Sequence, residues 1–238
     1  MLPTIPSLLT PATVSVLPPR GLNTRVYLDV NRFSRQTAWA HTFMHHYALW
    51  LGAVLLAVIF LLAYALAWWR REVAATSLLV LGGIGTLVGL GLNQLVAHAA
   101  GELRPYDTLP HVLVLVPKAH DFSFPSDHSV IAGALITSVL LVVRRTGRPS
   151  IPVALTVCSA VLGLFLCFAR VYVGAHYPGD VVAGFLLGVV VVGLISLLRP
   201  LAFPLAAWLD RTPLGLLVSR PPAPAGIHAG VEATDGQP

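Results

Sequence analysis

Long apolar stretches without charge dominate the chain. Five intervals contain no Asp, Glu, Lys or Arg between their end residues: Arg35 to Arg70, Glu72 to Glu102, Asp127 to Arg144, Arg148 to Arg170 and Asp180 to Arg199. A helix that crosses a bilayer needs roughly 20 apolar residues. The pattern therefore predicts five membrane spans, with cores near residues 46–69, 75–98, 128–143, 151–169 and 181–198. The third core is the shortest, and its helix is expected to begin partly outside the hydrocarbon.

The composition supports this interpretation. Apolar residues make up 56% of the 238 residues and charged residues 11%, whereas an average globular domain is about a quarter charged. One large soluble domain would need charged helix faces, and these are missing. The formal charge of +5 does not indicate nucleic-acid binding, because the basic residues lie at helix ends. We expect an all-α, polytopic membrane helical bundle.

The segments outside the spans lack a long hydrophobic pattern. Residues 1–24 and 209–238 are predicted to be disordered, with the membrane domain between them at 25–208. An N-terminal interfacial helix is predicted to begin at Asn31 as its cap and to turn Phe33, Trp39 and Phe43 toward lipid. The apolar middle of the connection between spans two and three, residues 109–116, is expected to touch lipid tails.

Small residues inside the spans are interpreted as packing residues. Gly85 and Gly89 form a GxxxG pair, which favours close contact between helices. Cys158 and Cys167 lie nine residues apart without the spacing of metal ligands. Both cysteines are predicted to be small buried apolar residues.

Arginine placement predicts the orientation in the membrane. Eight of the fifteen Lys and Arg residues fall on one side of the five spans, at positions 70, 71, 144, 145, 148, 199, 211 and 220. By the positive-inside rule this side is cytoplasmic, and the polar segments of the other side face the exterior. The N-terminal arginines do not fit this arrangement, since five spans place them outside. A sixth crossing would change that assignment.

The stretch at residues 119–129, AHDFSFPSDHS, has the features of an anion site. Ser126 is predicted to be the N-cap of the third span, directly before Asp127 and His128. The free backbone N–H groups of a first helical turn, together with the helix dipole, attract phosphate.

Two further polar clusters fall on the same side of the membrane. One holds Arg104. The other holds Arg170, His176 and Asp180. Pro178 suits the first helical position, which makes Tyr177 the cap and lets Asp180 reach back as a capping-box acid that also orients His176.

This set of side chains predicts phosphoester cleavage. One of His176 and His128 can attack phosphorus while the other protonates the leaving oxygen. The forks of Arg104 and Arg170 match phosphate oxygens. For each residue alone a structural role is the commoner one, and that interpretation is kept for His41, His45, His46, His98, His111 and His120. A metal site fits less well, because two arginines would repel a cation and the histidines lack ligand spacing.

These residues resemble the type-2 phosphatidic acid phosphatase superfamily, membrane lipid phosphatases that share their site with vanadium haloperoxidases. The second element of the family signature, Pro-Ser-Gly-His, is similar to residues 125–128, with Asp127 in place of Gly. The third element matches at Arg170, His176 and Asp180, with Ala169 in place of Ser. The first is half present: the Arg-Pro pair stands at 104–105, but Ala97 occupies the position of its Lys.

The resemblance implies a role for each matched residue. His176 would be the nucleophile that forms a phosphohistidine, Asp180 its orienting partner and His128 the general acid. Neither a metal nor another cofactor would be needed. The phosphate would be held by Arg104, Arg170, Ser126 and the backbone at Asp127. The missing Lys could be replaced by His98 or Lys118.

Asp127 in the context SFPSDHS is similar to undecaprenyl-diphosphatases of the bacitracin-resistance type. This resemblance implies a polyprenyl diphosphate as the lipid partner and a site on the outer face of a bacterial plasma membrane. Phosphatidic acid and phosphatidylglycerol phosphate are the alternative substrates. A non-catalytic protein that binds or transports lipid phosphates is the alternative of another class.

Overall fold

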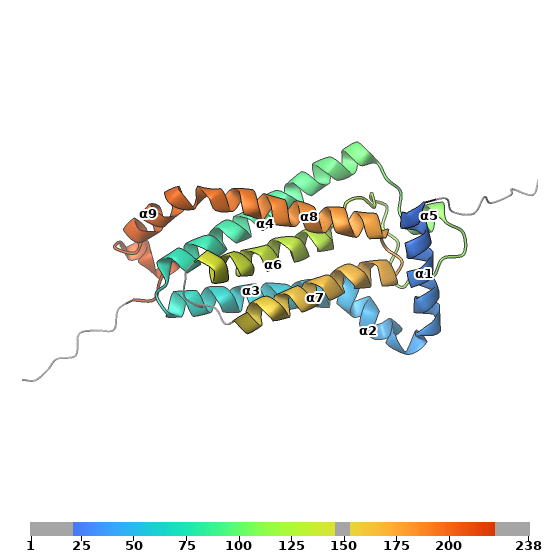
Figure 1. The fold of residues 1–238 in the computed structure, drawn as a ribbon, viewed down its shortest axis with the longest axis horizontal. Coiled ribbons are helices and arrows are strands. Elements are labelled where there is room, and N and C mark those ends of the chain that lie inside the picture. Colours follow the sequence, from blue (N-terminus) through green and yellow to red (C-terminus); the bar gives the residue numbers. More distant parts are fainter. Residues whose placement is uncertain (1–20, 146–152, 222–238) are drawn as a thin grey trace, which may run out of the picture.

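The chain folds into an elongated bundle of long helices (Figure 1). The computed structural model describes residues 21–145 and 153–221. The long helices are α3 (Gly52–Trp69), α4 (Val73–Ala100), α6 (Asp127–Arg145), α7 (Val153–Tyr172) and α8 (Pro178–Ile195). The candidate membrane spans in this part of the chain are Ala38–Trp69, Val73–Thr108, Asp127–Arg144, Val153–Tyr172 and Pro178–Leu209. The prediction of five spans is confirmed, and the third is the shortest at 18 residues.

Shorter elements extend the two ends of the bundle. At one end α1 (Leu22–Gln36) lies across the long helices, near α5 (Pro105–Thr108) (Figure 1). The chain then passes through a 3-10 turn at Ala38–Ala40, α2 (His41–His46) and the π-helix η2 (Tyr47–Leu51) into α3. The opposite end is formed by η3 (Ser196–Leu198), α9 (Arg199–Leu209) and η4 (Pro213–Leu217).

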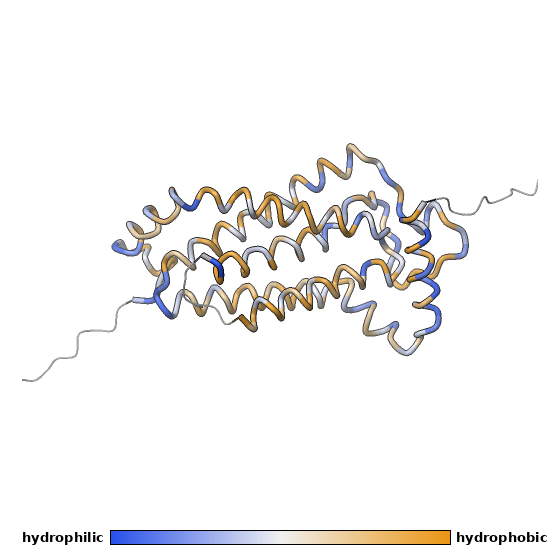
Figure 2. Tube along the Cα trace, in the orientation of Figure 1, coloured by the Kyte–Doolittle hydropathy of each residue, from blue (hydrophilic) through white to orange (hydrophobic). Residues whose placement is uncertain are grey.

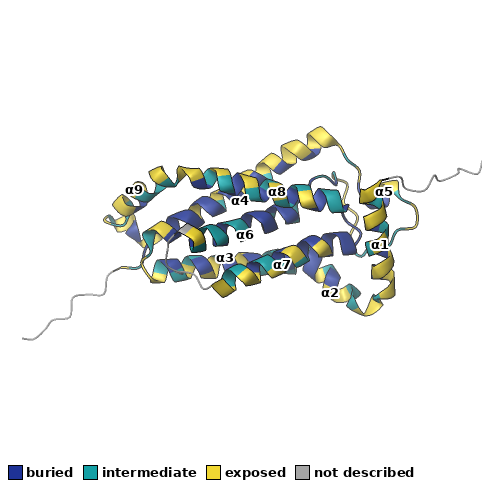
Figure 3. Ribbon diagram, viewed as in Figure 1, coloured by how far each residue is buried: buried dark blue, intermediate teal, exposed yellow. Residues whose placement is uncertain are grey.

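Helix α6 occupies the centre, buried along most of its length, while the outer helices expose apolar side chains (Figure 3). Glycines allow α6 and α8 to approach closely. A Cβ atom added at Gly133 would lie 2.1 Å from Phe185 O, and one added at Gly188 would lie 2.2 Å from Val130 O. At Gly184 it would lie 2.5 Å from Ser126 O. This contact places the start of α6 beside the start of α8.

The predicted GxxxG packing on α4 is confirmed. A Cβ atom at Gly85 would lie 2.9 Å from Val192 Cγ2, and one at Gly89 would lie 3.3 Å from Val130 Cγ1. These two glycines therefore let α4 pack against α8 and α6.

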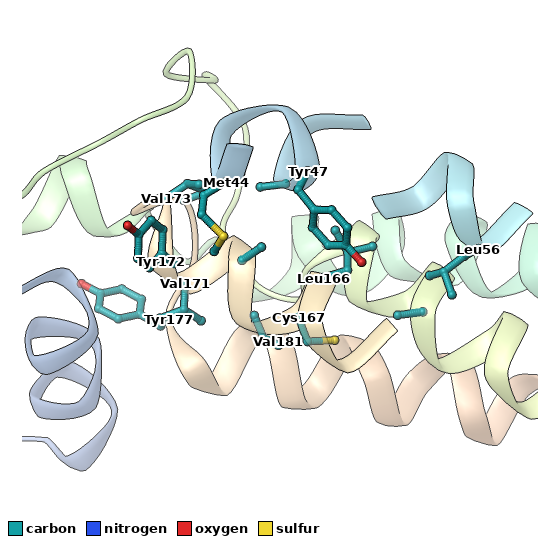
Figure 4. Packing of buried hydrophobic residues seen from close by; sticks show 14 of the residues in the cluster. Met44, Tyr47, Leu56, Leu166, Cys167, Val171, Tyr172, Val173, Tyr177 and Val181 are labelled. Atoms are coloured by element: carbon teal, nitrogen blue, oxygen red, sulfur yellow. The ribbon is translucent and has the colours of Figure 1, made fainter. Parts of the chain in front are cut away.

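A cluster of buried aromatic and aliphatic residues joins α2, η2 and α7 beside α1 (Figure 4). Tyr47 donates a hydrogen bond from its hydroxyl to Leu162 O at 2.8 Å. Tyr27 of α1 contacts the ring of Tyr177 with 5.3 Å between centroids. The segment that precedes α3 is thereby fixed against the end of α7.

Asn31 does not cap a helix. Its helix, α1, begins nine residues earlier at Leu22, so Asn31 lies within it, and its side chain is buried. Its side chain donates to Leu113 O at 2.7 Å and accepts from Leu113 N at 3.0 Å. The segment 109–116 packs on the core cluster through Leu109, Val112, Leu115 and Val116, which are only partly buried. The expected lipid contact of this segment stays a prediction.

Cys167 is buried, as predicted, but Cys158 is exposed on α7. A lipid-facing position accepts a small apolar side chain as readily as a core position does, so composition alone does not separate the two. The predicted disorder of residues 1–24 and 209–238 falls mostly outside the described ranges. Within them, residues 22–24 belong to α1, and residues 213–217 form η4.

The two ends of the bundle differ in charge. Hydrophilic residues gather at both ends, with an apolar middle (Figure 2). Arg70 and Arg71 follow α3, and Arg220 is tied to the same end by its backbone hydrogen bond to Trp68 O at 3.2 Å. The segments that carry Arg104, His128, Arg170 and His176 meet at the other end. This separation is the one that arginine placement predicts.

Substituting Gly188 by Ala should destabilise the fold, since the added methyl group meets backbone atoms of α6 that cannot move aside. We expect a loss of about 1–3 kcal/mol. Gly193→Ala on the same helix is the matched control, because nothing lies within 4 Å of its added Cβ. Thermal unfolding in detergent measures both variants. Equal midpoints for the two would contradict the close α6–α8 contact.

Candidate active site

A cavity of ≈ 200 Å³ opens at the end of the bundle near α5. It lies where α7 ends, where α6 begins and where the loop after α5 crosses them. The charged and histidine side chains that line it are Arg104, Asp121, Asp127, His128, Arg170 and His176. The structure therefore brings together residues from all three polar clusters that the sequence singled out.

His176 presents one ring nitrogen to this cavity. Its Nδ1 lies 2.8 Å from the carbonyl oxygen of Ser123. A carbonyl can only accept a hydrogen bond, so Nδ1 carries the proton and Nε2 keeps its lone pair. Arg104 Nη1 and Arg170 Nη2 each lie 3.2 Å from that Nε2 atom. The nitrogen suited to nucleophilic attack thus lies between two phosphate-binding groups.

The surroundings keep this imidazole neutral. Burial, followed by the positive charges of Arg170 and Arg104, lowers the pKa of His176 to about 4, against the opposing effect of Asp180. At neutral pH the ring is therefore unprotonated at Nε2 and remains a nucleophile.

Asp180 stands directly behind His176. The predicted capping box at the start of α8 is confirmed, with Tyr177 N donating to Asp180 Oδ2 at 2.9 Å. The same oxygen accepts from Ser123 Oγ at 2.5 Å and lies 3.6 Å from His176 Nδ1. The direct hydrogen-bond acceptor of the imidazole is thus Ser123, which links His176 to Asp180. Nothing in the sequence indicates that Ser123 orients His176, because the backbone carbonyl of Ser123 makes the contact and every residue has one.

Each arginine is anchored by a backbone carbonyl as well. Arg104, the residue before α5, donates from Nη1 to Ala175 O at 3.0 Å and from Nε to Asp121 Oδ1 at 2.8 Å. Arg170 donates from Nη1 to Ala48 O at 2.9 Å. Both guanidinium groups are buried in fixed orientations.

His128 is held in a similar way. Its Nε2 lies 3.1 Å from Leu49 O, so this nitrogen carries a proton. Leu49 and Ala48 both belong to the π-helix η2, an irregularity that often marks functional sites. The apolar sequence of residues 47–51 does not distinguish a π-helix from regular helix.

Asp127 is tied to α4 by side chains that the sequence analysis did not select. Asn93 Nδ2 donates to Asp127 Oδ1 at 2.6 Å and to Pro125 O at 3.0 Å. Gln94 Nε2 donates to the same carboxylate at 3.0 Å. A buried Asn in an apolar span is a signal that could have identified this contact.

Ser126 precedes the first residue of α6, but it does not form the predicted capping bond. Its hydroxyl is buried and, among the described residues, has no hydrogen-bond partner, while its carbonyl accepts from Val130 N at 3.0 Å. The backbone of α8 at Gly184 packs against it. Neither Ser126 nor Asp180 lines the cavity, so both lie behind its wall.

The position of the missing Lys, Ala97, is buried on α4. His98 contacts Phe122 edge to face with 5.5 Å between ring centroids, and Lys118 Nζ lies 5.5 Å from the centre of the Tyr106 ring. Neither His98 nor Lys118 lines the cavity. The positive charge of the cavity comes from the two arginines.

The helical bundle has five candidate membrane spans in its described part and a cavity lined by two arginines and two histidines, which can accommodate a phosphate group. The family model for the PAP2 superfamily matches residues 74–203, and the chain belongs to this superfamily. It is therefore a phosphatase with membrane-spanning helices.

Proteins similar to this chain include several kinds of lipid phosphatase. Undecaprenyl-diphosphatase BcrC of Bacillus subtilis is 33% identical over 150 residues, which cover 59% of this chain and 72% of that protein. A lipid A 1-phosphatase of Rhizobium johnstonii is 40% identical over 100 residues, covering 38% of this chain and 37% of the relative. A PAP2-type phosphatidylglycerolphosphate phosphatase from Bacillus subtilis shares the fold, with a TM-score of 0.56 at 21% identity over 74% of this chain and 86% of that one.

The tautomer and the low pKa of His176 can be tested by NMR on protein labelled with ¹⁵N-histidine. The Nδ1–H form should persist from pH 8 to pH 5, with protonation near pH 4, because a pKa lowered to about 4 leaves the ring neutral above that value. The signal is assigned by its loss in His176→Gln. A midpoint near the ordinary value of about 6.5 would contradict the assignment.

Proposed function

We propose that this phosphatase removes the terminal phosphate of a polyprenyl diphosphate through a phosphohistidine on His176. The observation that carries the proposal is the neutral Nε2 atom of His176, 3.2 Å from a guanidinium nitrogen of each of two arginines. The similarity to undecaprenyl-diphosphatase BcrC and the Asp127 variant of the second signature element support the choice of substrate.

In the first step the terminal phosphate displaces Nε2 as the partner of both arginine forks. The freed lone pair attacks phosphorus, an N–P bond forms and the bond from phosphorus to the bridging oxygen breaks. Polyprenyl monophosphate leaves with a proton from His128, which acts as the general acid in its imidazolium form, formed by proton uptake from solvent when the diphosphate enters, and becomes a neutral imidazole on donating it. Ser123 and Asp180 hold the imidazole while it gains positive charge.

In the second step a water molecule attacks the phosphohistidine. His128, now a neutral imidazole, accepts a proton from the water and returns to the imidazolium form. The N–P bond breaks, inorganic phosphate departs, and His176 returns to its neutral form. The arginines contribute most where charge builds up on the phosphoryl oxygens, and loss of one such donor typically lowers kcat about 10²–10³-fold.

The site is proposed to face the exterior of a bacterial plasma membrane. The basic residues that follow α3, together with Arg199, Arg211 and Arg220, mark the opposite end as cytoplasmic. A diphosphate head group would then enter from the outer leaflet.

Phosphate release from purified protein in detergent tests the proposal. Undecaprenyl diphosphate, phosphatidic acid, phosphatidylglycerol phosphate and lipid A are compared as substrates, each with and without EDTA. Release should be fastest from undecaprenyl diphosphate and unaffected by EDTA. His176→Gln should lower it on the order of 10³-fold or more. His98→Gln, which changes an exposed histidine outside the cavity, is the matched control.

Each alternative predicts a different outcome. Faster release from a glycerolipid or from lipid A would replace the proposed substrate. Loss of release in EDTA would overturn the metal-free mechanism. Retention of lipid without any release would identify a binding or transport protein. Equal activity of His176→Gln and wild type would remove His176 as the nucleophile.

A further inference from the structure

The cavity is close to neutral, although its proposed ligand is an anion. Arg104 and Arg170 line it, but so do Asp121 and Asp127. The formal charges of these four side chains cancel. Ala97, at the position where the family signature has a Lys, adds no charge. An entering phosphate group therefore meets two carboxylates as well as two arginines.

The two carboxylates are held differently. Asp127 is fixed by Asn93 and Gln94, both on α4. Asp121 lies on the loop between α5 and α6, and its side chain is 59% exposed, whereas that of Arg104 is 8% exposed. Asp121 can therefore leave the cavity by rotation of its own side chain, while the arginine remains in place.

Asp121 accepts a hydrogen bond from Arg104 that would otherwise be available to a phosphate oxygen. Its Oδ1 lies 2.8 Å from Arg104 Nε. Nε–H belongs to a two-donor edge of the guanidinium group, which matches carboxylate and phosphate alike. Burial opposes ionisation of Asp121, but its hydrogen bond with Arg104 and the positive charge of that arginine prevail and lower the pKa of the carboxyl group. The resident group is therefore a carboxylate anion.

We propose that Asp121 is an exchangeable counter-ion of the phosphate site: it pairs with Arg104 while the cavity is empty, and an entering phosphate displaces it. Once Asp121 has turned outward, the cavity walls carry a net positive charge, and Arg104 Nε is free for a phosphate oxygen. When the product phosphate leaves, Asp121 returns. The identity of the ligand as a phosphate rests on the proposed function.

This exchange sets how tightly the site holds a phosphate group. A bare phosphate must overcome the Asp121–Arg104 pair with its own charge alone, so inorganic phosphate should bind weakly and leave readily. A lipid-linked phosphate has additional binding energy from the apolar chain. Asp121 is thus a specificity-determining residue that favours lipid-linked phosphate over the free anion.

Isothermal titration with inorganic phosphate, and separately with orthovanadate, tests the proposal at low ionic strength. Removing the competing anion in Asp121→Asn should lower both dissociation constants about tenfold, because an opposing unit charge next to the site is lost. Asp121→Ser provides a second neutral variant. Asp121→Glu should bind like wild type. Asp107→Asn, which removes an exposed carboxylate of α5 outside the cavity, should also leave binding within about twofold.

The direction in which the dissociation constants change decides between the possible roles of Asp121. If Asp121 only orients Arg104 for its ligand, then Asn and Ser will weaken phosphate binding, which overturns the proposal. Unchanged binding in both variants, or no binding in any of the proteins, overturns it as well. An equal gain in Asp107→Asn would reduce the effect to general surface charge and would likewise overturn it.

Binding and turnover separate this proposal from the proposed function. Titration does not need catalysis, so it is repeated in the His176→Gln background. Tighter binding in Asp121→Asn without phosphate release from any lipid would support the counter-ion and contradict the phosphatase mechanism. Phosphate release by wild type, together with unchanged phosphate binding in Asp121→Asn, would support the phosphatase mechanism and contradict the counter-ion.

Discussion

Four backbone carbonyl groups hold the polar side chains of the cavity. The oxygens of Ala48, Leu49, Ser123 and Ala175 accept from Arg170, His128, His176 and Arg104 respectively. Polar groups near the hydrocarbon are unfavourable without partners, and regular helices use their own carbonyls internally. The site can therefore exist only where the backbone is irregular, and each of these carbonyls lies in a π-helix, a turn or a loop.

Helix packing brings these irregular segments together. The absence of side chains at Gly184 and Gly188 lets α8 lie against α6, so that the start of α6 reaches Asp180 through the hydrogen bond from Ser126 N to Asp180 O at 3.1 Å. The polar stretch before α6 and the capped start of α8 become a single wall. The phosphatase site is thus a consequence of close packing deeper in the membrane region, at positions that contain no reactive group.

The sequence predicted the features that depend on residue type. Charges are rare in lipid, so their positions delimited the five spans, and the same rarity made Arg104, Arg170, His128 and His176 conspicuous. Ser123, Ala48 and Leu49 could not be found in this way, because they act through backbone atoms that every residue possesses. Cys158 is exposed rather than buried, as its residue type could not show, because lipid and protein interior accept the same side chains. Ser126 has the residue type of an N-cap, but it packs tightly against α8, and within residues 21–145 and 153–221 its hydroxyl has no hydrogen-bond partner.

The π-helix η2 has a consequence for the first span as a whole. In a helix with 3.6 residues per turn, one additional residue rotates everything that follows by about 100°. The π-turn therefore changes which sequence positions share a face: the buried residues Met44, Ala48, Gly52 and Leu56 follow one another four positions apart across it. A shorter, perfectly regular helix would fit the bilayer equally well, but its carbonyls would all be used within the helix. The irregular register of this span thus belongs to the candidate site, because it frees the carbonyls that accept from Arg170 and His128.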